Sequence, residues 1–91
     1  MPEDMRTERL LAETELVRSR GEPESRKLCI MSLVARLAEE PHSDHPQAAS
    51  PAVGAFARAI NDAMDRQTRQ RLIPFAPRIK GTHAAHDGAR M

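Results

Sequence analysis

Residues 28–38 read Leu-Cys-Ile-Met-Ser-Leu-Val-Ala-Arg-Leu-Ala, and this stretch decides the fold. Its apolar side chains cover more than half of the circumference of an α-helix, which is typical of a helix buried on most sides. We expect the helix to run from about Ser25, a suitable N-cap, to Glu40, with Pro41 ending it. The stretch is therefore predicted to form the centre of the core, with Cys29 as a small buried apolar residue.

Two further main helices are predicted, one on each side of this stretch. Residues 4–20 are rich in Glu, Arg and Leu and carry only a thin apolar stripe, which cannot hold a helix in water by itself. Ser50 and Pro51 begin the other helix, over 51–66, because serine caps a helix and proline fits its first turn. The apolar stripe of this helix consists of Val53, Phe56, Ala57, Ile60 and Met64.

A short fourth helix is expected at residues 69–73, followed by one more turn after Pro74. The apolar residues expected to close the core here are Leu72, Ile73, Phe75 and Ile79. No segment alternates apolar and polar residues as a half-buried strand does. The predicted fold class is therefore all-α: a compact bundle of three main helices plus a short C-terminal helix, with a proline-rich loop between the second and third helices.

The composition is that of one small domain. The 91 residues are 40% hydrophobic and 2% aromatic, so the core must be small and aliphatic. This length excludes a two-domain enzyme. We expect an acidic N-terminal helix and turn at 1–24, a helical core at 25–80 and a mobile tail at 81–91. In one alternative the N-terminal helix is an arm that awaits a partner.

Charge and targeting signals narrow the function classes. A net charge of +1 does not favour a nucleic-acid binder, although the basic stretch 66–80 keeps weak nucleic-acid binding as an alternative. A single cysteine excludes an intrachain disulfide. The N-terminal residues are charged where a signal peptide is apolar, and the apolar run 28–35 is far shorter than the roughly 20 residues that span a bilayer. We therefore expect a cytoplasmic protein with no membrane contact.

The segment between Pro41 and Pro46 carries the most distinctive chemistry. It places two imidazoles, a carboxylate and a hydroxyl within four residues: His42, Ser43, Asp44 and His45. Histidine and aspartate are good ligands for divalent ions, so one hypothesis is a metal site formed by His42, Asp44 and His45. The favoured interpretation makes Ser43 and Asp44 turn or capping groups with both histidines at the surface. No other cofactor is expected.

The dipeptide Asn61-Asp62 is the second polar feature. Asn61 borders the apolar stripe of its helix, so its amide must find partners if it is buried, and Ser43-Asp44 is the expected partner. This pattern favours a structural role, and the alternative is an acid–base pair formed by Asp44 and Asp62. The sequence has no oxyanion-hole motif, no glycine-rich phosphate loop and no nucleophile signature, so an enzyme is not the favoured class.

Several short motifs resemble those of a group of small uncharacterised bacterial helical proteins. The matching motifs are C-x-M at 29–31, E-x-x-S-D-x-P at 40–46, a proline-led helix ending in N-D at 61–62, and G-T at 81–82. The resemblance covers about residues 26–82 and implies a bacterial origin and a shared fold, but no activity. Glu39 and Ala48 stand where that group often has glycine and a second cysteine, and the missing cysteine weakens the metal hypothesis.

Together these features predict a non-catalytic helical interaction or regulatory module. Its partner is expected to be another protein or a second copy of the chain, bound through the first helix or the basic C-terminal face. A small core often gains stability from such a partner. The alternatives are a metal-binding protein with its site in the loop 42–45, and a weak nucleic-acid-binding module that uses residues 66–80.

Overall fold

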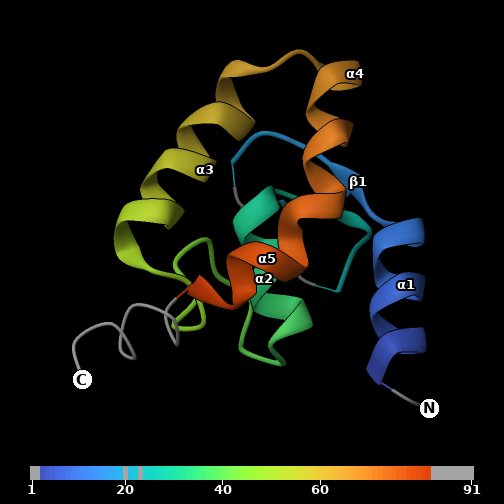
Figure 1. The fold of residues 1–91 in the computed structure, drawn as a ribbon. Coiled ribbons are helices and arrows are strands. Elements are labelled where there is room, and N and C mark those ends of the chain that lie inside the picture. Colours follow the sequence, from blue (N-terminus) through green and yellow to red (C-terminus); the bar gives the residue numbers. More distant parts are fainter. Residues whose placement is uncertain (1–2, 20, 23, 83–91) are drawn as a thin grey trace.

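The computed structural model describes residues 3–19, 21–22 and 24–82, so most of the tail predicted at 81–91 lies outside the described residues. The elements are α1 (Glu3–Glu13), β1 (Glu15–Leu16), β2 (Lys27–Leu28), α2 (Ile30–Leu37), α3 (Pro51–Ala63), α4 (Arg66–Arg69), the 3-10 helix η1 (Gln70–Phe75) and α5 (Ala76–Lys80). The protein is mostly helical, with α2 among the other helices (Figure 1). None of the helices in the described residues is long and apolar enough to span a membrane.

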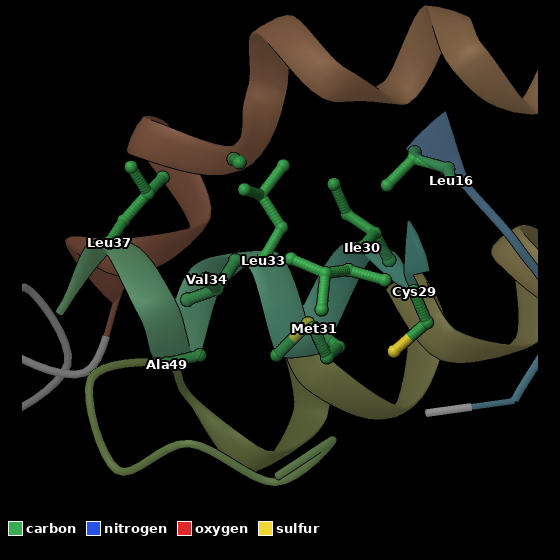
Figure 2. Packing of buried hydrophobic residues seen from close by; sticks show 10 residues of the cluster. Leu16, Cys29, Ile30, Met31, Leu33, Val34, Leu37 and Ala49 are labelled. Atoms are coloured by element: carbon green, nitrogen blue, oxygen red, sulfur yellow. The ribbon is translucent and has the colours of Figure 1, made fainter. Parts of the chain in front are cut away.

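The core forms along α2, as the apolar stretch predicts. Every residue of this helix except Arg36 is buried, and both α3 and α5 pack against it. Figure 2 shows the aliphatic cluster that results, with side chains from β1, α2 and the loop before α3. Its members are Leu16, Leu28, Cys29, Ile30, Met31, Leu33, Val34, Leu37, Ala49 and Ala76. Full burial of one such leucine or isoleucine contributes about 1.5–3 kcal/mol, so this cluster is the main stabilising feature.

A short parallel ladder between β1 and β2 corrects the predicted all-α class. The backbone N–H of Val17 donates to the carbonyl of Leu28 at 2.8 Å, and that of Glu15 donates to Arg26 at 2.8 Å. The predicted first helix therefore ends at Glu13. Two residues per strand are too few for an alternating pattern, so periodicity could not reveal them.

Cys29 sets the start of α2, several residues after the predicted N-cap at Ser25. Its Sγ accepts a hydrogen bond from the backbone N–H of Ser32 at 3.3 Å, and Ser32 Oγ accepts one from the backbone N–H of Cys29 at 2.9 Å. This reciprocal pair is a capping box in which a thiol replaces the usual hydroxyl. Cys29 is buried, as predicted, and has a capping role in addition.

The helix α3 begins as predicted, but only part of its predicted stripe meets the core, where Ala57 packs against the core cluster. Ser50 Oγ accepts a hydrogen bond from the backbone N–H of Val53 at 3.4 Å. The buried residues are Gly54 and Asn61, whereas Phe56 is 69% exposed. The expectation that Phe56 belongs to the core stripe is therefore wrong. The hydrogen bonds of Asn61, described below, turn the helix so that small and polar residues meet α2.

The C-terminal segment is more continuous than predicted. The elements α4, η1 and α5 follow one another without a break, and Pro74 lies inside η1. Leu72, Ile73 and Ile79 pack against the core cluster as expected, but Phe75 is 49% exposed and does not close it. At the start of α4, Asp65 accepts a hydrogen bond from the backbone N–H of Thr68 at 2.7 Å, which lowers the pKa of the Asp65 carboxyl.

The helix α1 contacts the core through Leu10 and Leu11. Arg6 reaches the C-terminal end of α2, where its guanidinium donates to the carbonyl oxygens of Arg36 at 2.9 Å and Leu37 at 3.3 Å. The last carbonyls of a helix have no partner within the helix, and a cation there is favourable. Arg6 therefore ties α1 to the end of the central helix.

Candidate functional site

Asn61 is fully buried and connects three elements. Its Oδ1 accepts a hydrogen bond from the backbone N–H of Ile30 at 3.0 Å, and its Nδ2 donates to the carbonyl of Val17 at 2.9 Å. The expected partner, Ser43-Asp44, is therefore wrong. The donor and the acceptor of the Asn61 amide are both used by backbone groups outside the loop. The amide instead fixes the start of α2 and the residue that follows β1 to α3.

The two carboxylates of the predicted acid–base pair have different partners. Asp62 is exposed, and its Oδ1 accepts hydrogen bonds from the backbone N–H of Ser19 at 3.1 Å and from Asn61 Nδ2 at 3.0 Å. Asp44 Oδ1 lies 2.7 Å from His45 Nδ1. Asp62 thus belongs to the hydrogen-bond network around Asn61, and Asp44 belongs to that of the loop.

Arg69 is a buried residue of this junction that the sequence patterns did not reveal. It is 6% exposed, and its Nε donates to the carbonyl of Asn61 at 2.6 Å while its Nη2 donates to the carbonyl of Met64. It therefore caps the C-terminal end of α3. The signal in the sequence is an arginine shortly after the end of an amphipathic helix, but the basic residues around it hide that signal.

Gln70, which is half-buried, is a second residue that the sequence patterns did not reveal. Its Oε1 accepts a hydrogen bond from the backbone N–H of Leu16 at 2.7 Å, and its Nε2 donates to the carbonyl of Leu16 at 3.0 Å. A primary amide carries a donor and an acceptor, as a peptide group does. The Gln70 side chain therefore supplies β1 with the hydrogen bonds that another strand would make.

One arginine of the basic stretch 66–80 is thus used inside the protein. Arg69 is buried, and Arg66 forms an ion pair with Glu15 at 2.9 Å. Arg71 is exposed, and the Arg78 guanidinium lies 6.0 Å from the centroid of the Phe75 ring. Of these four arginines only Arg69 is withdrawn from solvent, because the side chain of Arg66 stays exposed in its ion pair, and nucleic-acid binding by this face stays a prediction.

The two histidines of the proline-rich loop line different cavities. His42 lines a cavity of about 470 Å³ together with Arg6 and Arg36. His45 lines another, of about 330 Å³, together with Arg58. In the part of the chain that the structure describes, no three His, Cys, Asp or Glu side chains gather closely enough to hold a metal ion. The metal site at His42, Asp44 and His45 stays a prediction.

Local hydrogen bonds shape the loop. Ser43 Oγ accepts a hydrogen bond from the backbone N–H of His45 at 2.9 Å, as the turn interpretation expects. The Glu40 carboxylate accepts hydrogen bonds from the backbone N–H groups of Gln47 at 2.7 Å and Ala48 at 2.9 Å. Glu40 therefore closes the loop from the end of α2.

The environment of His42 leads to a specific prediction for the free energy of unfolding. Its Nε2 is buried and has no hydrogen-bond partner among the described residues. An unpaired buried polar atom costs about 1–3 kcal/mol. We expect His42→Leu to raise the free energy of unfolding by about 1 kcal/mol, measured by urea denaturation.

The matched control is His45→Leu, because the His45 side chain is exposed and its replacement removes no buried unpaired atom. A lower midpoint for His42→Leu would contradict the prediction. The wild type and both variants are also measured with added zinc. A zinc-dependent rise of the wild-type midpoint that His42→Leu and His45→Leu both lose would support the metal hypothesis.

The outer face of α3 is an exposed apolar helix surface. We call it the α3 outer face; it consists of Ala52, Ala55, Phe56, Ala59 and Ala63, all of which are exposed. These residues recur at helical spacing and so share one side of α3. The helix lies along one edge of the molecule (Figure 1).

Comparisons of the chain with models of known families, with curated proteins and with solved structures give no match.

Proposed function

We propose that this protein is a small non-catalytic interaction module that binds a second copy of itself through the α3 outer face. The observation that carries the proposal is Phe56, which is 69% exposed in the middle of an uncharged face. Single exposed apolar residues are ordinary, but contiguous apolar patches mark interaction surfaces. Aromatic residues are enriched in the centres of such interfaces.

Three buried or half-buried polar side chains support a scaffolding role rather than catalysis. Asn61, Arg69 and Gln70 all bond to backbone groups of neighbouring elements. Each side chain therefore stabilises the fold, because its polar atoms bind other parts of the same protein. A rigid small scaffold that presents one apolar helix face suits recognition of another helix.

The α3 outer face is complementary to itself when two helices pack antiparallel. With the twofold axis between Ala57 and Arg58, Phe56 lies opposite Ala59 of the partner subunit, and Ala52 lies opposite Ala63 of the partner subunit. A large side chain thus meets a small one at each central position, and alanines allow two helices to approach closely. A twofold dimer requires such a self-complementary patch.

We expect Phe56→Arg to abolish self-association, because it places a charge at the centre of the apolar face of both copies. Sedimentation velocity at a protein concentration of about 0.1 mM would show a dimer for the wild type and a monomer for the variant. The matched control is Phe75→Arg, which changes the other exposed phenylalanine and leaves the dimer intact. A monomeric wild type, or a loss of the dimer only in Phe75→Arg, would contradict the proposal.

A further inference from the structure

We propose that the cavity between the proline-rich loop and α3 binds a small carboxylate with an apolar body, such as a medium-chain fatty acid. This loop–α3 cavity measures about 330 Å³, which lies within the range of small-molecule sites. Apolar groups of Met31, Pro46 and Ala49 line it, together with the basic side chains of His45 and Arg58. No acidic side chain lines it among the described residues.

Arg58 carries the positive charge of the site. It is half-buried, and its Nη1 donates to the carbonyl of Asp44 at 2.8 Å. This bond fixes the guanidinium beside the cavity and uses one of its five N–H donors. The remaining donors suit a carboxylate, which guanidinium groups bind with charge-assisted hydrogen bonds.

Asp44 also positions the second basic group. Its Oδ1 lies 2.7 Å from His45 Nδ1, so this contact orients the imidazole and leaves Nε2 as its other polar atom. The backbone carbonyl of Asp44 thus holds Arg58, and its side chain holds His45. One loop residue brings both basic groups to the same cavity.

Gly54 allows the side chains of Arg58 and Met31 to lie close to the backbone of α3 beside the cavity. Glycine weakens a helix interior relative to alanine, and Gly54 is an interior residue of α3. A Cβ at this position would lie 3.2 Å from Arg58 Nη1 and 3.2 Å from Met31 Cε. The absence of a side chain therefore preserves the placement of Arg58 and the apolar wall of the cavity.

The cavity beside His42 lacks this preference for anions. It is lined by three carboxylates, Glu24, Glu39 and Glu40, besides its basic residues. An anionic ligand would meet repulsion there that the loop–α3 cavity does not present. The charge pattern thus assigns a carboxylate to the cavity beside Arg58.

Isothermal titration calorimetry of the full chain with sodium octanoate at neutral pH tests this site. We expect one site per chain with a dissociation constant of about 1 mM or below. Acetate, which has no apolar body, and octan-1-ol, which has no charge, should both bind at least about tenfold more weakly. Octanoate binding no tighter than that of acetate or octanol would overturn the proposal.

Two variants locate the site. Arg58→Gln should weaken octanoate binding by about tenfold, because it removes the cation and keeps a hydrogen-bonding side chain. The matched control, Arg71→Gln, changes an exposed arginine away from the cavity and should bind as the wild type does. Gly54→Leu should block octanoate by filling the space, and circular dichroism checks that each variant is folded. Unchanged affinity in folded Arg58→Gln would overturn the proposal, as would an equal loss in Arg71→Gln.

Discussion

Asn61→Ala is expected to lower the free energy of unfolding by about 3–5 kcal/mol. The change leaves two backbone groups without their partner: the N–H of Ile30, which is buried, and the carbonyl of Val17, which is half-buried. Each such group costs about 1–3 kcal/mol, and the lost side-chain volume adds to that. Since domains of this size have a total stability of about 5–15 kcal/mol, the variant should be largely unfolded at moderate urea.

The neighbouring residue supplies the control for this prediction. Asp62→Ala removes an exposed carboxylate that has two partners. The backbone N–H of Ser19 is exposed and can bind water instead, and Asn61 Nδ2 keeps its hydrogen bond to the carbonyl of Val17. We expect a loss below about 1 kcal/mol. Urea denaturation followed by circular dichroism measures both variants, and equal losses would show that Asn61 is not the junction described here.

Arg69→Met should lower the free energy of unfolding by about 2–3 kcal/mol. Methionine keeps much of the apolar stem but removes the donors that reach the carbonyls of Asn61 and Met64. The end of α3 would then carry two unsatisfied carbonyl groups next to the core. The same denaturation experiment measures the loss.

Arg71→Met is the matched control, because Arg71 lies two residues away and is exposed. We expect a change within about 0.5 kcal/mol. If Arg69→Met were as mild as Arg71→Met, the capping of α3 by Arg69 would not contribute to stability. The pair also separates a structural arginine from a solvent-facing one within the same basic stretch.

The parts of the fold that the sequence predicts are those set by strong local signals. The apolar stretch 28–38 predicts the central helix because no other segment could be buried on so many sides. Ser50 and Pro51 predict the start of α3 because capping and the proline ring act within one turn. The proline-rich loop between the second and third helices is predicted because Pro41 ends one helix and Pro51 begins the next.

The parts that the sequence does not predict depend on contacts between distant residues. The two strands are too short for a pattern, and they exist because β1 meets β2 and the side chain of Gln70. The outward position of Phe56 follows from the hydrogen bonds of Asn61, which periodicity alone cannot weigh against an aromatic ring. Cys29 was recognisable as buried, but a thiol is an uncommon cap.

The residues of the candidate site show the same division between what the sequence predicts and what it does not. Asn61 is recognisable as a buried polar residue that needs partners, yet its partners are Val17, directly after β1, and Ile30 of α2, and not the loop. The loop histidines are close in sequence, but the backbone between them directs them to different cavities. Spacing along the chain therefore identified the polar residues without showing which of them meet.

The most direct test of self-association through the α3 outer face exchanges its large and small residues. Phe56→Ala alone removes the ring, and Ala59→Phe alone opposes two rings, so each should shift sedimentation equilibrium towards the monomer. The double variant Phe56→Ala, Ala59→Phe restores one ring opposite one alanine in the antiparallel pair. We predict that it recovers the wild-type dimer. A double variant that is as monomeric as the single variants, while still folded, would contradict this arrangement.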